Sequence, residues 1–411
     1  MMTTFRNLTW AYTFVLASSV LAQGDYEGPQ TFKSSDVLPA GALKGPHFTV
    51  GPDAKTEGYF HEFVLTSDYG TLDVEGTTLL EVRLREVDAL AKLADVSKSE
   101  VFLAAAGNSV LNVGKGAVSA VREPAATAKG IGSGIKRFGT NLGRTAKQAT
   151  DQGSSPGDPD KSTSEKAANS VLGVNSAMRR WAQKVGADPY TTNPILRKAL
   201  EDIGQIDAAG SIAAKVVVPI PMVVSAAGSV GNLVWGKDPQ ELQKLNETRV
   251  AELGADESTA RGFFRAKGFT LTYQTVFIDA LYGVKAKGSA DYVRTASTAE
   301  TEREALFFAE SAQMLKRLHA TSRVAAVLPD SRAMVARTND GRAVVLLPVD
   351  WVYWTPAFEK GAAEIGRRAR QELSATSLEL EMTGRMSPTA REKLTALGWT
   401  MKEGAALRPS R

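Results

Sequence analysis

The segment that most constrains what this chain can fold into is its first 22 residues, because they predict folding outside the cytoplasm. Arg6 precedes an uncharged run from Leu8 to Ala22, which is too short to be a stable membrane anchor. Val20 and Ala22 then occupy the −3 and −1 positions of a signal-peptidase site. We therefore predict a secretory signal peptide over residues 1–22 and an exported protein, either periplasmic or secreted.

The absence of cysteine from the sequence limits both the stabilisation and the chemistry of the exported chain. It excludes disulfides, thiolate metal sites and a cysteine nucleophile, so buried cores must stabilise the fold. An exported protein of 411 residues without disulfides is typical of a bacterial cell envelope. The 49 basic and 45 acidic residues nearly balance, so we expect no nucleic acid partner for the molecule as a whole.

Hydrophobic spacing predicts a small N-terminal module that contains β structure and covers residues 23–149. Tyr59–Leu65 has the composition of a strand, and Ser67–Gly70 that of a turn. Over residues 77–97 the spacing becomes helical, which predicts an amphipathic helix. The apolar stripe of this helix is Leu80, Leu84, Val87, Leu90 and Leu93.

A second helical phase is expected over residues 101–149, with an interruption at Pro124. The next segment, 150–168, begins with a stretch that has no large apolar residue and is rich in Gly, Ser, Pro and Asp. Such a stretch cannot offset its ordering entropy by burial. We predict a linker or a long mobile loop there.

Residues 169–320 are predicted to form a helical domain. It contains a helix over residues 195–210 and a helix start at Ser297–Glu300, where a hydroxyl and a carboxylate stand three residues apart. The buried stripe of that last helix is predicted to be Leu306, Ala309, Ala312, Leu315 and Leu318.

Residues 321–411 are predicted to form an α+β region. Two apolar runs flank Asn339–Gly341, which is the signature of a tight hairpin. A strand with alternating side chains follows at Leu378–Met382, and Ser387 with Pro388 then indicates a helix start. The whole chain is therefore predicted to be a mainly helical α+β protein, with a small β-containing N-terminal module, a central helical body and a C-terminal β-hairpin and αβ tail.

One candidate binding surface is a basic segment between residues 115 and 147. It carries seven cations against one acid, Glu123, and its other side has an apolar stripe. Such a segment can bind an anionic membrane surface or a protein partner. The remaining alternative is that it packs on the rest of the domain with its charges in solvent. The seven cations are Lys115, Arg122, Lys129, Lys136, Arg137, Arg144 and Lys147.

A second candidate is the run 216–236, which has no charge and is long enough to cross a hydrocarbon core. Pro219, Pro221 and several small residues favour a buried core segment instead. A third candidate is the aromatic cluster Trp351, Tyr353 and Trp354, which could form a binding patch if exposed, or belong to the core that its preceding strand predicts.

The sequence contains no pattern that predicts a catalytic residue, a metal ligand or a cofactor site. His61-Glu62 begins like a zinc-protease helix, but Leu65 stands where the second histidine is needed, so we expect His61 in a strand. Asp68, Asp73 and Glu75 are the nearest candidates for a carboxylate pair, and we expect them on an exposed turn.

These observations predict an exported, non-enzymatic structural or interaction protein of the bacterial cell envelope or periplasm. The alternative is a membrane-peripheral or membrane-active protein that works through segments 115–147 and 216–236. The third choice is a hydrolase of cell-wall or polysaccharide material. The expected partner is a protein or an anionic membrane surface.

Overall fold

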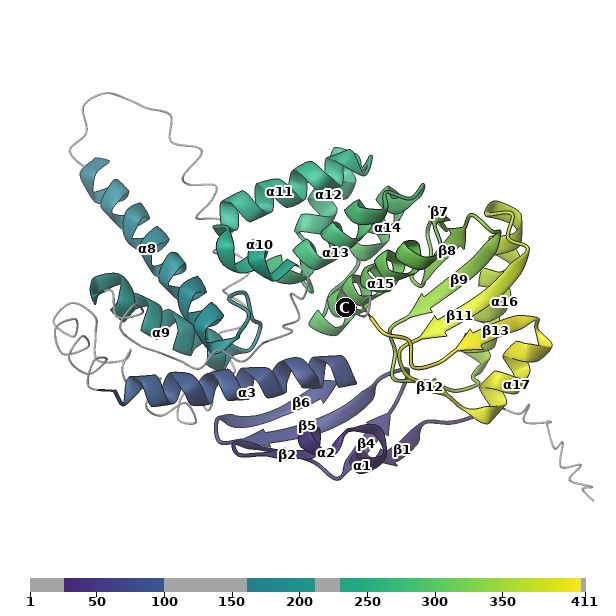
Figure 1. Cartoon of the computed structure of the whole chain (residues 1–411), viewed down its shortest axis with the longest axis horizontal. Helices are drawn as coiled ribbons and strands as arrows, with labels where there is room; N and C mark the ends of the chain where they lie inside the picture. The colour runs from purple at the N-terminus through teal and green to yellow at the C-terminus, as the bar shows by residue number, and fades with distance from the viewer. Residues whose placement is uncertain (1–25, 100–160, 211–229, 408–411) are drawn as a thin grey trace, which may run out of the picture.

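The computed structural model of the chain describes residues 26–99, 161–210 and 230–407 (Figure 1). They form an α+β fold in which helices predominate, with a β-sheet module first, a helical centre next and a second sheet last. The predicted fold class is therefore confirmed. The predicted signal peptide at residues 1–22 and the second helical phase over 101–149 lie outside the described residues.

An antiparallel sheet of six strands forms the N-terminal module, in the order β1-β4-β5-β3-β2 with β6 paired to β5. The predicted strand and turn are present as a hairpin of β5 (His61–Ser67) and β6 (Gly70–Glu75). Side chains on β5 alternate between buried and exposed, so one face of the sheet is directed into the core. The other elements are β1 (Gln30–Lys33), α1 (Ser34–Val37), α2 (Ala40–Leu43), β2 (Lys44–Gly45), β3 (Phe48–Val50) and β4 (Asp53–Thr56).

Helix α3 (Thr77–Ser97) joins this sheet to the helical centre and has the predicted bounds. It contacts β5 and β6 on one side, and α8 (Lys161–Val185) and α9 (Pro194–Gly210) on the other (Figure 1). Leu80, Val87, Leu90 and Leu93 of the predicted stripe are buried, and Leu84 is partly buried.

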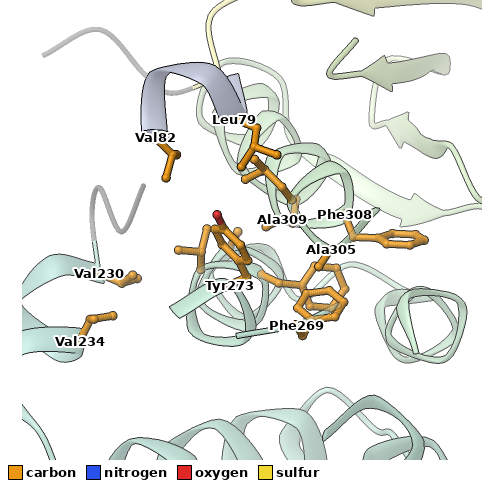
Figure 2. Close-up of a cluster of buried hydrophobic side chains, with 14 of the residues drawn as sticks. Leu79, Val82, Val230, Val234, Phe269, Tyr273, Ala305, Phe308 and Ala309 are labelled. Atoms are coloured by element: carbon orange, nitrogen blue, oxygen red, sulfur yellow. The ribbon is translucent and has the colours of Figure 1, made fainter. Parts of the chain in front are cut away.

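The helical centre is built around α13 (Leu271–Val284) and α15 (Glu302–Thr321), which pack along each other. Phe263 and Phe277 stack with ring centroids 5.2 Å apart in this core. Figure 2 shows side chains from α3, α10, α13 and α15 gathered in it, among them Val82, Val234, Tyr273 and Ala309. The remaining helices are α10 (Gly231–Gly236), α11 (Pro239–Glu252), α12 (Glu257–Phe264) and α14 (Ser289–Ala296).

Two predicted boundaries differ from the structure. Helix α8 begins at Lys161, so the last part of the predicted linker 150–168 is helical, whereas 150–160 lies outside the described residues. Residues 161–168 contain no Gly or Pro and include good helix formers such as Lys, Glu and Ala, which allows the helix to extend.

The second boundary concerns α15, which does not begin at Ser297–Glu300. Ser297 instead ends α14, and the capping box is formed by Thr301 and Glu304. The Thr301 hydroxyl accepts the Glu304 backbone N–H at 3.2 Å, and the Glu304 carboxylate accepts the Thr301 N–H at 3.2 Å. The same hydroxyl-carboxylate spacing occurs twice in succession, and only the second pair caps the helix. The predicted stripe of α15 is buried.

The second sheet has the strand order β13-β11-β9-β8-β7, in which β9, β11 and β13 are parallel and β8 is antiparallel to its neighbours. The predicted hairpin turn at Asn339–Gly341 joins β8 to β9, and Ser387 caps α17 with Pro388 at its first position. The elements are β7 (Val324–Val327), β8 (Met334–Thr338), β9 (Arg342–Leu347), α16 (Pro356–Glu372), β11 (Ser377–Met382), α17 (Pro388–Ala396) and β13 (Trp399–Lys402).

This sheet separates two hydrophobic cores. One face contributes to the core of the helical centre, through Met334, Ala336, Val344 and Leu346. The opposite face packs under α16 and α17, through Val335, Ala343, Val345, Leu378 and Leu380. The strict alternation along β8 and β9 follows from the two-residue period of a strand, and it leaves α16 and α17 as an outer layer (Figure 1).

Candidate functional site

The two segments on which the membrane-binding alternative depends fall mainly outside the described residues. All seven cations of the basic segment 115–147 lie there, as do residues 216–229 of the uncharged run. The end of that run forms α10, and Val230 and Val234 are buried in the core shown in Figure 2. None of the helices in the described ranges is long and apolar enough to cross a membrane.

The aromatic cluster at residues 351–354 is not an exposed binding patch. Tyr353 and Trp354 are buried, and Trp351 is half-buried with its ring edge-on to Phe32 at a centroid distance of 5.0 Å. Trp354 packs edge-on against Phe358 of α16 at 5.9 Å. The rings follow an apolar strand into the interior, so they contribute to packing between the two sheets.

Asp68, Asp73 and Glu75 are exposed, as expected, but only Asp68 lies in the turn, because Asp73 and Glu75 belong to strand β6. Asp68 pairs with His47, with 2.8 Å between the carboxylate oxygen and Nδ1. Partial burial raises the pKa of Glu75, and the nearby Arg303 guanidinium opposes this shift. His61 lies in strand β5, where burial lowers the pKa of its ring and the ring Nδ1 lies 2.7 Å from the Thr56 hydroxyl. Over the described ranges, His, Asp and Glu side chains do not gather into a metal-binding set.

The parallel strands β9 and β11 end at the same edge of the second sheet. Ligands of other open α/β sheets commonly bind at the carboxyl ends of the strands. Here two short strands, β10 (Trp351–Val352) and β12 (Arg385–Met386), extend the edge as a parallel pair. A Cβ atom on Gly384 would lie 1.9 Å from the carbonyl oxygen of Asp350, so only glycine fits at this approach.

The N-terminal module occupies this edge. Asp350 accepts the backbone N–H of His61 at 2.9 Å and that of Thr77 at 3.0 Å. The backbone N–H groups of Asp350 and Trp351 both donate to the carbonyl oxygen of Tyr59, at 3.0 and 3.1 Å. The carboxyl ends of these strands, where other open α/β sheets commonly bind ligands, are therefore covered by the N-terminal module.

A second contact closes the same edge from the start of the described chain. The Glu27 carboxylate accepts the Trp354 backbone N–H at 2.7 Å and the hydroxyl of Ser387, the residue that caps α17. The Glu27 backbone N–H donates to the Trp354 carbonyl oxygen at 2.8 Å. Residues separated by more than half of the chain thus form one structural unit.

A buried ionic cluster lies where α3 meets the helical centre. We call it the Arg83 cluster, and it comprises Arg83, Glu86, Asp188, Tyr273 and Glu302. Arg83 pairs with Glu86 at 2.9 Å and with Glu302. The Tyr273 hydroxyl donates to Glu302 at 3.0 Å.

The loop between α8 and α9 completes the Arg83 cluster. The Asp188 carboxylate accepts the Thr272 hydroxyl at 2.7 Å and the Tyr190 backbone N–H at 2.8 Å. The Asn193 side-chain amide donates to Glu86 at 3.0 Å, and Thr191 donates to the same carboxylate. Four separate segments are therefore held together by one polar network.

Burial controls the ionisation of the Arg83 cluster. It raises the pKa of Asp188 to about 6 and the pKa of Tyr273 well above its usual range. Burial disfavours the charge on Arg83, but Glu86 and Glu302 outweigh it and raise the pKa of the guanidinium. Arg83, Glu86, Tyr273 and Glu302 bond to one another, and Asp188 bonds to Thr272 on α13. The cluster is therefore suited to joining helices.

A shallow hollow on the outer layer is the candidate binding site. We call it the α16 groove, and its volume is about 390 Å³. Helix α16 supplies one wall, and the turn from α17 into β13 supplies the other. Its apolar lining is Ala362, Ala363, Gly366, Leu397 and Trp399. Arg367, Arg370 and Gln371 supply its polar rim.

The groove combines small apolar residues with two arginines at its rim, Arg367 and Arg370. Leu397 is 42% exposed, and Tyr26 and Val64 are the other large hydrophobic side chains exposed to a similar degree among the described residues. The Arg370 guanidinium donates to the carbonyl oxygen of Gly366 at 3.3 Å. The sequence contained no signal for this groove, because its two walls come from separate elements that only the sheet brings together.

No family model, no curated protein and no solved structure matches this chain.

Proposed function

We propose that this chain is an exported, non-enzymatic interaction protein of the bacterial cell envelope or periplasm, which binds a protein partner. Residues 1–22 support export, and the absence of cysteine supports a bacterial envelope.

The observation that carries the proposal is the closed edge of the second sheet. Asp350 is hydrogen-bonded to the backbone of the N-terminal module. Glu27 is hydrogen-bonded to Trp354 in the loop that follows β10. Ligands of open α/β sheets commonly bind at this edge, and here the N-terminal module covers it. The Arg83 cluster is likewise directed inward, so its charged groups serve the joining of helices.

The surface that remains suited to binding is the α16 groove. Its lining is mainly apolar, with Leu397 exposed at one wall and two arginines at the rim. Apolar side chains surrounded by polar groups are typical of protein interaction sites. Helices α16 and α17, which supply the walls of the groove, lie on the outer layer, away from the helical centre (Figure 1).

Fractionation of the native host tests the location. We expect the protein in the periplasmic or envelope fraction, and we expect a salt wash to release any membrane-bound portion before an alkaline wash is applied. Recovery in the cytoplasm with Met1 intact would contradict export. Release of soluble fragments from purified cell wall or polysaccharide by the protein would contradict the non-enzymatic reading.

Site-specific photocrosslinking in the same host tests partner binding. A photoreactive residue replaces the exposed Ala363 in the α16 groove, and in a control it replaces the exposed Ala251 on α11. We expect a discrete crosslinked species from position 363 alone. Equal patterns from the two positions would mean that the groove holds no partner in the cell.

A second candidate function is supported by the basic segment 115–147, with its seven cations and one acid. In that case the protein is membrane-peripheral, and it binds anionic headgroups through this segment together with the run 216–236. Retention of the protein on membranes until high salt is applied would favour this candidate.

A further inference from the structure

We propose that the α16 groove binds an acidic apolar peptide segment, in which a Glu or Asp side chain is adjacent to a leucine-like side chain. This inference rests on the proposed function, because it names the chemistry of the partner for an interaction surface. It requires an apolar hollow of suitable size and a cation that is available to a carboxylate.

The apolar half of the site arises from small residues on α16. Ala362, Ala363 and Gly366 leave space on the helix surface, and Leu397 and Trp399 bound that space. Gly366 lies close to the sheet, since a Cβ atom there would be 3.0 Å from Leu378 and 3.4 Å from the Trp399 ring. A hollow of about 390 Å³ is at the small end of ligand sites, which suits one or two side chains.

The polar half of the site is the guanidinium of Arg370. Helix α16 carries three arginines in its second half, and two of them are paired with acids on the same helix. Arg367 pairs with Glu364 at 2.6 Å, and Arg368 pairs with Glu372 at 2.6 Å. Within the described part of the chain, Arg370 has the Gly366 carbonyl oxygen as its acceptor and no carboxylate within ion-pair distance.

Charge complementarity therefore selects an acidic partner. A carboxylate can accept two parallel N–H groups from one guanidinium, which gives both strength and orientation. An adjacent leucine-like side chain would then enter the hollow beside Leu397. A nucleic acid or a lipid surface would require several unpaired cations. The groove has two arginines in its lining, and Arg367 is already paired with Glu364, so Arg370 alone is left for a carboxylate beside the apolar floor.

A pair of peptides tests the inference with the full-length protein. The probe is acetyl-Ala-Leu-Glu-Leu-Ala-amide with a fluorescent label, and its matched control replaces Glu by Gln. Fluorescence anisotropy at low ionic strength measures both. We expect the Glu peptide to bind roughly tenfold more tightly, because hydrogen bonds to charged groups are stronger than those between neutral groups.

Three variants locate the binding. Arg370→Gln should remove the preference for the Glu peptide while leaving weak binding of the Gln peptide. Leu397→Asp should weaken both peptides, since it places a charge at the apolar wall. Arg265→Gln removes an exposed arginine on the helical centre and should leave both affinities unchanged. Circular dichroism and thermal unfolding of each variant verify that the fold is retained.

Several outcomes overturn the inference. Equal binding of the two peptides, or the same preference in Arg370→Gln, would show that Arg370 does not select a carboxylate. Absence of binding to either peptide would show that the groove does not take such segments. Displacement of the Glu peptide by inorganic phosphate or by anionic vesicles at comparable concentrations would assign the site to anions in general.

Failure of this inference is separable from failure of the proposed function. Photocrosslinking from Ala363 reports whether any protein occupies the groove, whatever its sequence. A crosslinked species without peptide preference would therefore retain the interaction protein and reject the acidic segment. Peptide binding without envelope localisation would retain the groove and reject the cellular role.

Discussion

The carboxylate of Asp350 caps helix α3 by accepting the backbone N–H of Thr77 at 3.0 Å, although 273 residues separate the two. The helix has no cap of its own, because Gly76 at the N-cap position has no side chain and a φ of 96°. An anion at this end also interacts favourably with the helix dipole. The N-terminal module thus depends on the second sheet for the start of its principal helix.

Replacing Asp350 by Ala should lower the free energy of unfolding by about 2–4 kcal/mol. The substitution leaves the partly buried N–H groups of His61 and Thr77 without their acceptor. Urea denaturation monitored by circular dichroism measures the effect. Asp73→Ala, at an exposed position on β6, is the matched control and should change stability by less than about 0.5 kcal/mol. Similar stabilities of the two variants would contradict the capping role.

Asp188 should make the protein less stable as the pH rises. Its pKa in the folded protein is about 6, above the ordinary value of 3.8, so the folded state binds this proton more tightly than the unfolded state. The stability contributed by the group is full below about pH 4 and is lost as the pH rises through about 6.

Asp188→Asn should remove this dependence while keeping an oxygen to accept from Thr272. We expect the free energy of unfolding of the variant to exceed that of the wild type by up to about 3 kcal/mol at about pH 7.5. Near pH 4 the two values should be equal. Thermal unfolding of both proteins across this range provides the measurement. Parallel pH profiles for the two proteins would show that Asp188 is ionised with an ordinary pKa.

Removing one partner of the buried pair Arg303 and Glu310 should lower the stability of the protein more than removing both. The two side chains lie 2.6 Å apart and are 6% and 3% exposed, and the Arg303 guanidinium also lies over the Phe60 ring. Arg303→Met leaves Glu310 buried without its partner, which should cost about 3–5 kcal/mol. Adding Glu310→Leu should recover most of the loss, because no unpaired charge then remains. A double-mutant cycle by urea denaturation tests this, and additive losses would contradict it.

The basic segment 115–147 should bind anionic vesicles if the membrane-peripheral alternative holds. Each cation near an anionic leaflet contributes on the order of 1 kcal/mol, and salt screens this attraction. Co-sedimentation with vesicles should increase with anionic lipid and decrease with salt. Replacing Lys129, Lys136 and Arg137 together by Glu should abolish it, and unchanged binding of that variant would refute the alternative.

Export should produce a mature N-terminus at Gln23. This prediction follows from Arg6, the uncharged run to Ala22 and the residues before the cleavage site. Cleavage there would leave Glu27 in place to bond with Trp354 and Ser387. N-terminal mass analysis of the native protein gives a direct answer, and an intact Met1 would exclude a cleaved signal peptide.

Local sequence signals determined the elements that could be predicted. The stripe from Leu80 to Leu93 defined α3, the turn at Ser67–Gly70 defined the β5–β6 hairpin, and Ser387-Pro388 defined the start of α17. Each signal lies within one element and reflects a period or a cap that a short segment carries by itself. The exclusion of disulfides likewise followed from composition alone, because the sequence has no cysteine.

Tertiary structure decided which of two equivalent local signals was used and which distant groups met. Ser297–Glu300 and Thr301–Glu304 have the same spacing, and only the second caps α15. The sequence around Trp354 permitted either a buried ring or an exposed patch. In the folded chain its backbone N–H donates to Glu27 and its ring packs edge-on against Phe358, so the side chain is buried.

The Asp350 cap, the Arg83 cluster and the α16 groove depend entirely on contacts between distant segments. Asp350 meets Thr77 across 273 residues, and Arg83 meets Glu302 across 219. A carboxylate in a sequence window has the same appearance whether it caps a helix, pairs with an arginine or faces solvent. Its role is set by burial and by the partner that packing brings to it, and that information exists only in the folded chain.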